Sequence, residues 1–438
     1  MALSKRVSRR RFLSQTVAVA AVSVPTIISA RALAAPGRPG ANDRIGVGYI
    51  GVGRRGNQLM GLPSEGRIVA VADVDRRRAD AVGAKRSCRA YQDYRELLDS
   101  KDIDAVVVAT PDHWHVLASI HACQAGKDIY LEKPLSLTIR EGRILVEAVR
   151  KHGRVLQTGT QRRSMDGHRY GCELVRNGLA GKIHTVEILN YPSPWECRFP
   201  GQSVPDGLDW NRWCGMTEPV PYHSDIFIQR SQPGWISLRP YSGGEMTGTG
   251  AHGFDQIQWA LDLDHTGPVE VSMEGGKLPP IAYSAPHAIA RGNAACSRGR
   301  RVTMRYANGI EIRLVDNGPA AGGVFIGDRG KIRIGNNVVT SNPEALAKTP
   351  ADQLKFRLPE TGSHMQNWFN CIKSREKPVA DVEIGHRSAV VCHLGNIARW
   401  VGRPLRWDAE REIFPGDDEA NRFLDRPRRT PYELPELV

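Results

Sequence analysis

The sequence RIGVGYIGVGRRG, residues 44–56, decides the fold predicted for this chain. Its apolar first half is typical of a buried β-strand, which leads directly into the glycine motif Gly51-x-Gly53-x-x-Gly56. In such a motif one glycine permits a tight turn, one lets the backbone approach a pyrophosphate, and one lets the next helix pack on the strand. The stretch therefore predicts a dinucleotide site at the start of a helix.

A carboxylate at the end of the next predicted strand supports the same site. Residues 67–73 form an apolar run that ends in Asp73, 22 positions after Gly51. An aspartate there can bind the hydroxyl groups of an adenosine ribose, and it repels the 2′-phosphate of NADP. NAD is therefore the predicted cofactor rather than NADP, although the three arginines at positions 76–78 offset part of that repulsion.

Alternating strand and helix patterns continue as far as residue 158. They predict an α/β fold with a doubly wound parallel sheet, a Rossmann domain, at residues 35–159. From residue 160 the loops lengthen, and β-rich segments predict a substrate-binding α+β domain, residues 160–438, with a largely antiparallel sheet, C-terminal helices and a tail. The predicted helices are residues 75–85, 92–98, 115–125, 138–152, 251–261, 363–372 and 385–400, and the β-rich segments are residues 182–190, 269–273, 301–306, 310–315 and 331–334.

The positive charge of the chain does not indicate a nucleic-acid-binding protein. The formal net charge is +13, but six basic residues lie before residue 35, which leaves +7 for the rest of the chain. No basic block is interleaved with aromatic residues, so we expect no nucleic-acid partner.

The early arginines belong to an N-terminal targeting pattern. The sequence SRRRFL, residues 8–13, precedes an apolar stretch from Thr16 to Ala30 and a small-residue site at residues 32–34. This pattern resembles a twin-arginine signal peptide, residues 1–34, which implies export of the folded protein by the twin-arginine machinery to the periplasm or another extracytoplasmic space. An uncleaved membrane anchor is the alternative, although the apolar stretch is short for a membrane span.

Cysteine and histidine spacing does not predict a metal site. The eight cysteines form no CxxC pair and no Cys/His ligand spacing, so we expect buried free thiols, with disulfides as the alternative. His113 and His115 alternate as metal ligands can, but no further ligand set follows at a convincing spacing.

Five motifs in succession resemble those of the Gfo/Idh/MocA oxidoreductase family. They are Gly51-x-Gly53-x-x-Gly56, Asp73, ATPDHWH at residues 109–115, Glu132-Lys133-Pro134 and GAHGFD at residues 250–255. The resemblance covers almost the whole chain after residue 34. It implies a Rossmann domain followed by a domain whose open sheet covers the nicotinamide, acting on sugars, polyols and their derivatives, in a homo-oligomer formed through that sheet.

The resemblance also implies the catalytic residues. Lys133 would be the active-site lysine, and His252 would take the proton from the alcohol as a hydride leaves for the nicotinamide. Many dehydrogenases of the family have an aspartate four residues before this histidine, where the present chain has Gly248. Glu245, in a glycine-rich segment, is a candidate for the missing carboxylate, and a different chemistry is the alternative.

Binding residues follow from the same motifs and from the composition of the second domain. Candidate cofactor-binding residues are Gly51, Gly53, Arg54, Arg55, Gly56, Asp73, Thr110, Pro111, His113, His115, Glu132 and Lys133. Aromatic and hydrogen-bonding side chains together suit a carbohydrate ring, although core packing is the alternative for any single tryptophan. Candidate substrate-binding residues are Gln161, Arg162, Trp195 and Asp255, the last on the same helix face as His252.

The predicted function is that of an exported NAD-dependent oxidoreductase of a sugar, polyol or glycoside. Because an extracytoplasmic space offers little free NAD, we expect a tightly bound cofactor that is regenerated in place. The alternatives are an NAD-dependent glycosidase that oxidises and re-reduces one substrate, and a non-catalytic carbohydrate-binding protein, which the glycine at position 248 would suit.

Overall fold

The computed structural model describes residues 44–227, 234–279, 282–283, 297 and 299–436 of the chain. The proposed signal peptide, residues 1–34, lies outside the described residues, as does Cys296. Ile45–Val438 belong to one structural unit, which contains both predicted domains.

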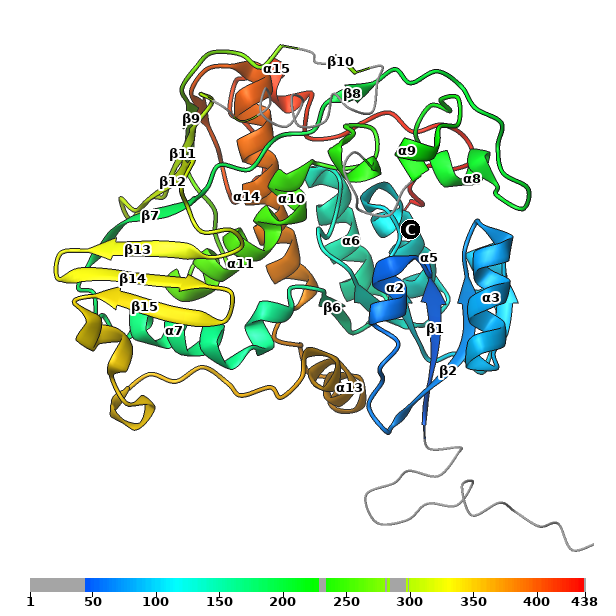
Figure 1. Cartoon of the computed structure of the whole chain (residues 1–438), viewed down its shortest axis with the longest axis horizontal. Helices are drawn as coiled ribbons and strands as arrows, with labels where there is room; N and C mark the ends of the chain where they lie inside the picture. Colours follow the sequence, from blue (N-terminus) through cyan, green and yellow to red (C-terminus); the bar gives the residue numbers. More distant parts are fainter. Residues whose placement is uncertain (1–43, 228–233, 280–281, 284–296, 298, 437–438) are drawn as a thin grey trace, which may run out of the picture. The chain divides into compact units, whose positions relative to one another are not determined.

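The apolar run that begins at Ile45 forms an inner strand of a six-stranded parallel sheet (Figure 1). In pairing order the strands are β3 (Arg89–Tyr91), β2 (Gly66–Ala72), β1 (Ile45–Ile50), β4 (Ala105–Val108), β5 (Asp128–Leu131) and β6 (Leu156–Thr158). Every residue of β1 and β4 is buried, as expected of parallel strands covered on both faces. The strand order reverses between β1 and β4, and this arrangement leaves a ligand crevice at their carboxyl ends. The predicted doubly wound sheet is confirmed.

The helices of this domain are α2 (Arg54–Gln58), α3 (Arg76–Arg86), α4 (Tyr94–Leu98), α5 (His115–Gln124) and α6 (Ile139–Lys151). Four of them begin within two residues of their predicted starts, and α2 is the helix expected after the glycine motif. The side chains of Asp75, Asp93 and Thr138 cap α3, α4 and α6 by accepting hydrogen bonds from backbone N–H groups of the first turn.

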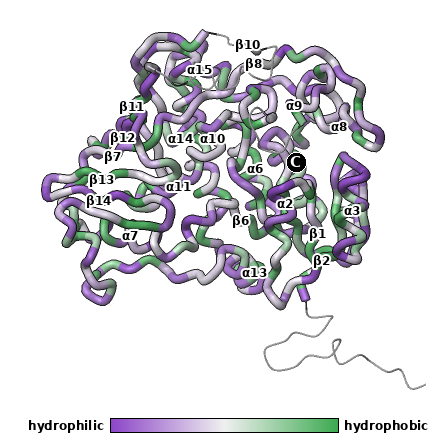
Figure 2. The backbone as a smooth tube through the Cα atoms, in the orientation of Figure 1, coloured by the Kyte–Doolittle hydropathy of each residue, from purple (hydrophilic) through white to green (hydrophobic). Residues whose placement is uncertain are grey.

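The second sheet has eight strands and is antiparallel except where β7 and β12 pair. In pairing order they are β15 (Val338–Asn342), β14 (Gly330–Gly335), β13 (Gly323–Gly327), β7 (Ile183–Leu189), β12 (Glu311–Val315), β11 (Val302–Arg305), β9 (Glu270–Met273) and β16 (Leu405–Arg406). In β14 the exposed Lys331 and Arg333 alternate with the buried Ile332 and Ile334, an alternation visible in Figure 2. The α+β class with a largely antiparallel sheet is therefore confirmed. A short parallel pair joins β8 (Glu196–Cys197) to β10 (Ala282–Tyr283).

Helices cover one face of this sheet, with α7, α11 and α14 contributing to its core. The helices that follow residue 160 are α7 (Asp166–Arg176), α8 (Trp210–Cys214), α9 (Ser224–Phe227), α10 (Glu245–Gly248), α11 (Gly250–Leu261), α13 (His364–Ser374), α14 (Val382–Val401) and α15 (Asp418–Asn421), and not all of them lie on this sheet. Short 3₁₀ turns are η2 (Asp112–Trp114), η3 (Gln161–Ser164), η4 (Trp235–Ser237), η6 (Glu344–Lys348) and η7 (Ala351–Gln353). The predictions of α11, α13 and α14 are confirmed, whereas α7 was not predicted.

The two sheets share elements across the predicted domain boundary. Trp368 and Phe369 of α13 lie in the same apolar cluster as Val47 and Tyr49 of β1. Residues far beyond position 160 therefore complete the core of the first sheet.

No helix within the described residues is both long and apolar enough to cross a membrane. The six cysteines for which the structure gives a thiol environment, residues 88, 123, 172, 214, 371 and 392, are free.

A buried ion pair joins η3 to α11. Arg163 Nε lies 2.9 Å from Asp255 Oδ2, and both side chains are 1% exposed. Arg163 also donates to Asp264, at 2.7 Å, and Ser388 Oγ donates to Asp255 Oδ1, at 2.9 Å. Burial raises the pKa of Asp255, and the adjacent guanidinium opposes that rise.

We predict that Arg163→Met destabilises the protein by about 3–5 kcal/mol, because it leaves the Asp255 carboxylate buried without its cation. The free energy of unfolding is measured by urea denaturation. The matched control is Arg313→Met, which removes the exposed ion pair of Arg313 with Glu311 and is expected to cost less than about 1 kcal/mol. Equal losses in the two variants would contradict the prediction.

Candidate functional site

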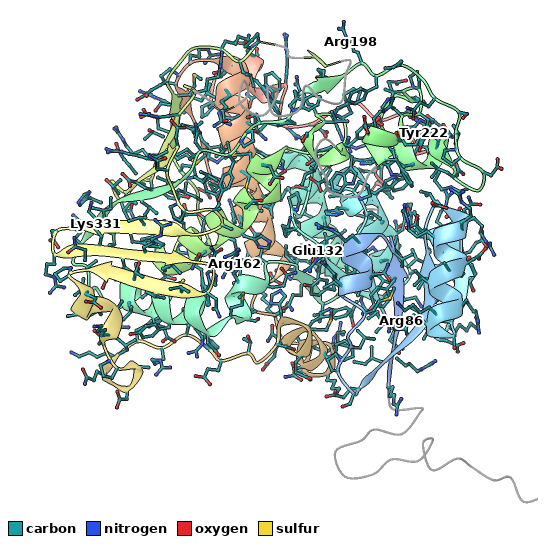
Figure 3. All side chains as sticks on the ribbon, viewed as in Figure 1. Arg86, Glu132, Arg162, Arg198, Tyr222 and Lys331 are labelled. Atoms are coloured by element: carbon teal, nitrogen blue, oxygen red, sulfur yellow. The ribbon has the colours of Figure 1, made fainter. Side chains whose placement is uncertain are left out.

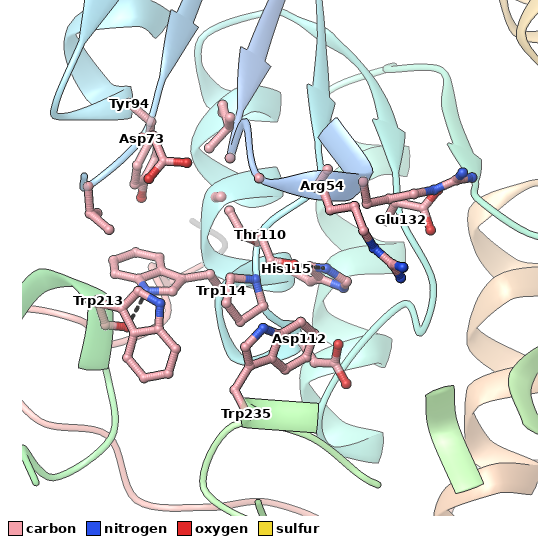
Figure 4. A pocket seen from close by; sticks show the side chains of 18 of the residues that line it. Arg54, Asp73, Tyr94, Thr110, Asp112, Trp114, His115, Glu132, Trp213 and Trp235 are labelled. Carbon is pink, nitrogen blue, oxygen red and sulfur yellow. Dashed lines mark hydrogen bonds and ion pairs between the residues drawn. The ribbon is translucent and has the colours of Figure 1, made fainter. Parts of the chain in front are cut away.

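A cavity of about 320 Å³ lies at the carboxyl ends of the first sheet and is bounded on its other side by the second domain (Figure 4). We call it the cofactor cavity. Its lining includes Gly51, Gly53, Arg54, Arg55, Asp73, Arg78, Thr110, Pro111, Trp114, His115, Glu132 and Lys133 from the first domain, and Gln161, Arg212, Trp213, Phe227, Trp235, Ile236 and His252 from the second. The structure thus brings most of the predicted cofactor residues, and both Lys133 and His252, to one cavity.

The glycine turn at the end of β1 has no room for side chains. Gly51 has φ +84°, and a Cβ atom there would lie 2.9 Å from the carbonyl carbon of Ala109. A Cβ atom at Gly56 would lie 2.2 Å from the Gly51 oxygen. The bend and the close packing of α2 on β1 therefore require glycine at these positions, which fits a nucleotide phosphate lying against the backbone.

Asp73 lies at the end of the cofactor cavity marked by Tyr94 (Figure 4). Its carboxylate accepts hydrogen bonds from Val52 N and Asp75 N, both at 3.0 Å, and from Arg78 Nη1 at 3.2 Å. The Arg78 guanidinium also lies 4.9 Å from the centre of the Phe227 ring. Because Arg78 neutralises part of the charge of Asp73, the carboxylate alone does not decide between NAD and NADP.

The turn between β4 and α5 has one buried hydroxyl that suits a ligand. Thr110 Oγ1 has no hydrogen-bond partner among the described residues, although it is buried. His115 lies between two carbonyl groups, with Nδ1 2.6 Å from Pro134 O and Nε2 3.1 Å from Thr110 O. The His115 ring therefore ties this turn to the segment after β5.

His113 does not line the cofactor cavity. Its Nε2 lies 2.8 Å from Trp213 O, and burial lowers its pKa to about 3, so the ring is neutral. The ring packs between the Trp213 and Tyr241 side chains, with centroids 5.4 and 5.1 Å away. The structure therefore gives His113 a role in joining the two domains, in place of the predicted contact with the cofactor. Within the described residues, no group of three His, Cys, Asp or Glu side chains is arranged to hold a metal ion.

Lys133 contacts the position at which the family aspartate would lie. Its Nζ donates to the backbone oxygen of Gly248 at 2.9 Å. A Cβ atom at Gly248 would lie 2.9 Å from Ile236 Cδ1 and 3.1 Å from Glu245 Oε2. Atoms of Ile236 and Glu245 therefore already fill the space for a side chain at position 248. The backbone carbonyl of Gly248 accepts a hydrogen bond from Lys133.

Glu245 begins α10, and it is not among the residues that line the cofactor cavity. Its Oε2 accepts from Thr249 N at 3.1 Å and from Thr249 Oγ1 at 2.6 Å. These bonds direct the carboxylate toward the start of α11, the helix on which His252 lies. A catalytic role for Glu245 stays a prediction, and the geometry favours a structural one.

Glu132 joins the glycine turn to the second domain. Its Oε1 accepts from Arg55 Nε at 2.8 Å and from Gln161 Nε2 at 2.9 Å. Figure 3 labels Glu132 and Arg162 near the centre of the molecule. Gln161, a predicted substrate residue, thus lines the cofactor cavity beside the predicted cofactor residues Arg55 and Glu132.

The other predicted substrate residues lie elsewhere. Asp255 is committed to its ion pair with Arg163, Trp195 is 2% exposed within an aromatic cluster, and Arg162 Nη1 lies 2.9 Å from His168 Nε2. None of the three lines the cofactor cavity.

Trp235 and Ile236 both line the cofactor cavity. Trp235 is one of the second-domain tryptophans that the sequence offered as platforms for a sugar ring, although it was not among the four candidate substrate-binding residues, and Ile236 was not predicted. Figure 4 shows Trp235 extending from η4 into it. The signal was present as a tryptophan-rich loop region, but its members differ in surroundings: Trp210 and Trp213 stack on each other with ring centres 4.5 Å apart, and of these two only Trp213 lines the cavity. Spacing alone does not separate a tryptophan that lines the cavity from one that packs in the core.

Two family models match the chain. One, described as an oxidoreductase family NAD-binding Rossmann fold, matches residues 45–160, and the other, described as an oxidoreductase family C-terminal alpha/beta domain, matches residues 174–434. The 2,7-anhydro-N-acetylneuraminate hydratase of Mediterraneibacter gnavus is 29% identical over 237 residues, 53% of this chain and 53% of that protein. The chain therefore spans about half the length of this relative.

Other matches are longer but more distant. The scyllo-inositol 2-dehydrogenase (NAD(+)) of Bacillus subtilis is 23% identical over 369 residues, 84% of this chain and 96% of that protein. The WlbA dehydrogenase of Bordetella pertussis, solved in complex with NADH and UDP-GlcNAcA, has a TM-score of 0.57 and 18% identity, over 83% of this chain and 99% of that one. This likeness shows the fold.

We predict that Gly51→Ala weakens NADH binding by more than about 100-fold, because a methyl group at φ +84° meets the Ala109 carbonyl and moves the turn. Binding is measured by NADH fluorescence titration. Gly61→Ala is the control, since its Cβ atom would have nothing within 4 Å. Unchanged affinity in Gly51→Ala would show that this turn does not hold the nucleotide.

Proposed function

The chain belongs to the Gfo/Idh/MocA oxidoreductase family, and we propose that it transfers hydride between a carbohydrate or polyol hydroxyl carbon and a nicotinamide cofactor. The observation that carries this proposal is the meeting of Lys133 and His252, from different domains, in one cavity with the glycine turn. When bound, the nicotinamide supplies a hydride acceptor or donor. The protein must then bind the nucleotide, orient the alcohol and move its proton.

Each of these tasks has residues suited to it. The glycine turn and Asp73 would hold the pyrophosphate and adenosine ribose, and Thr110 Oγ1 offers a buried hydroxyl to the nucleotide. An ammonium has three N–H groups, so Lys133 can donate to a substrate oxygen while bonded to Gly248 O. His252, at the first turn of α11, would take the proton of the alcohol.

We propose NAD rather than NADP as the cofactor. The Asp73 carboxylate lines the cofactor cavity, where it would face the adenosine ribose, and of the three arginines at 76–78 only Arg78 lines that cavity, already paired with Asp73 at 3.2 Å. Arg76 pairs with Asp80, at 2.9 Å, and Arg77 lies 3.5 Å from Asp75.

Tight binding of the nucleotide is supported by main-chain contacts over the ribose end. Arg76 N donates to Gly207 O at 2.9 Å, and Asp209 N donates to Val74 O at 3.0 Å. These bonds join the second domain to the residues directly after Asp73. They limit how far the two domains can separate beside Asp73, and this favours slow release of a bound nucleotide.

The substrate we propose is a sugar, polyol or glycoside. Trp235 is half-buried in the cofactor cavity and can pack against the apolar face of a sugar ring, while Gln161 and Lys133 offer hydrogen bonds to its polar edge. The dehydrogenase among the relatives acts, by its name, on an inositol, a polyol of similar size.

We further propose that the protein is exported folded by the twin-arginine machinery to the periplasm, on the basis of SRRRFL at residues 8–13. A homo-oligomer formed through the open sheet is proposed from the family resemblance.

We predict that Lys133→Met lowers kcat by about 10²–10⁴-fold while NADH binds within about threefold of its usual affinity, because the lost ammonium assists proton movement. Reduced-nucleotide absorbance is followed with a panel of sugars, inositols and glycosides. Lys127→Met is the control, since Lys127 also donates to backbone carbonyls, of Ser100 and Ile103, away from the cavity.

The same assay separates the alternatives. Product without net reduction of nucleotide would favour internal redox cycling, as in a glycosidase, and equal kcat in Lys133→Met and the native protein would overturn the catalytic proposal. A Glu245→Gln variant is expected to keep kcat within about threefold, because its carboxylate bonds to Thr249. A loss as large as that of Lys133→Met would assign Glu245 the role of the missing aspartate.

We predict that the purified protein retains nicotinamide nucleotide after desalting, and that Phe227→Ala speeds its release by about tenfold. Phe227 lines the cavity and holds Arg78 beside Asp73, so its loss opens the ribose end. Nucleotide is quantified by chromatography after denaturation, with Phe356→Ala, at a surface position 40% exposed, as the control. Native protein that is purified without bound nicotinamide nucleotide would contradict the predicted retention.

A further inference from the structure

The C-terminal segment, residues 425–434, contacts the wall of the cofactor cavity from behind. Figure 1 shows it in red, running from α15 toward α5 and α8. The guanidinium of Arg426 donates to Glu141 Oε1 at 3.0 Å, to Pro240 O at 3.2 Å and to His113 O at 3.3 Å. One side chain therefore joins α6, the loop before α10 and the turn that begins α5.

Two further arginines fix the C-terminal segment on both domains. Arg428 Nη2 donates at 2.9 Å to the same Glu141 oxygen that Arg426 contacts. Arg429 donates to Asn211 O, within α8, at 2.8 Å and to Thr217 O, just after α8, at 2.9 Å. Charge-assisted bonds of this kind are stronger than neutral ones, so the segment is bound to α6 on one side and to α8 on the other.

These contacts hold Tyr432 against Trp114, a residue of the cavity wall. It is 7% exposed, and its ring lies edge-to-face on Trp114, with centroids 5.5 Å apart and planes at 85°. Trp114 lines the cofactor cavity, and its Nε1 donates to Trp213 O at 3.1 Å. A Cβ atom at Gly215 would lie 2.7 Å from the Trp114 ring, so that ring is closely packed on the side of α8 as well.

We propose that the C-terminal segment is part of the cofactor site, with Tyr432 and Arg426 as positioning residues for the turn at residues 111–115. Through Trp114 and the His113 carbonyl they hold this turn against α8 and so set the width of the cofactor cavity. The identity of the ligand rests on the proposed function, whereas the ordering of the turn does not.

The contacts determine which kinetic property depends on the C-terminal segment. Neither Tyr432 nor Arg426 lines the cofactor cavity, and no hydrogen bond from either reaches Lys133 or His252 among the described contacts. Removing Tyr432 therefore loosens the wall of the binding site and leaves the proton-moving groups in place. Affinity for the nucleotide falls, while kcat at saturating nucleotide is retained.

The test compares Tyr432→Ala with two matched variants of the full chain. Tyr432→Phe keeps the ring that packs on Trp114, and Phe423→Ala removes an aromatic ring from the same end of the chain that packs on Trp400 of α14 instead, at 5.5 Å. NADH affinity is measured by fluorescence titration. Amide hydrogen exchange of residues 112–116 is measured without nucleotide.

In Tyr432→Ala the Kd for NADH is expected to rise about tenfold, and amide exchange in residues 112–116 is expected to speed up. The kcat at saturating nucleotide is expected to stay within about twofold of the native value. Tyr432→Phe is expected to match the native protein, and Phe423→Ala to lower thermal stability without changing either readout. Equal effects of Tyr432→Ala and Phe423→Ala on Kd and exchange would overturn the proposal. If the native protein binds no NADH, the proposed function fails, and the exchange rates still decide whether the C-terminal segment orders the turn.

Discussion

The packing of Gly51 and Gly56 at the end of β1 is the constraint on which the site depends. Because the Gly51 turn touches the Ala109 carbonyl at the end of β4, the two strands at the reversal of the sheet are tied together where a ligand would bind. The same turn presents Val52 N to the Asp73 carboxylate, which fixes the end of β2 as well. Three strand ends are therefore positioned by a few backbone contacts that no larger residue would allow.

The first domain could be predicted almost completely because its signals are local. Apolar runs, the glycine motif and capping residues lie next to the structures that they determine, and Asp73 falls in the cavity as its spacing indicated. In the second domain α7 was missed because Gly167 and Gly171 weaken the helical pattern, and its stability comes from packing, with Gly171 close against Ile334 of β14. The glycine-bounded β13 and the polar edge strand β15 gave weak signals for similar reasons.

The predicted site residues that do not line the cofactor cavity share a physical cause. Asp255 shares a helix face with His252 by sequence, but the long-range partner Arg163 draws its carboxylate into the core. His113 lies in a cofactor motif, but Trp213, 100 positions later, takes its ring nitrogen. A motif gives the location of the backbone, whereas a polar side chain is directed by partners that only the folded chain brings near.

The glycine at position 248 alters what Lys133, the proposed catalytic lysine, can do. A carboxylate beside Lys133 could accept a proton, whereas the Gly248 carbonyl that replaces it accepts only a hydrogen bond. Ile236 fills the space beside Gly248, so a side chain could return there only if Ile236 moved as well. Proton exchange with a substrate would then fall to Lys133 and His252 themselves. Backbone hydrogen bonds at residues 74–76 and the C-terminal segment join the two domains. The cavity would therefore have little freedom to open during this chemistry. Such a cavity suits a nucleotide that stays bound between turnovers.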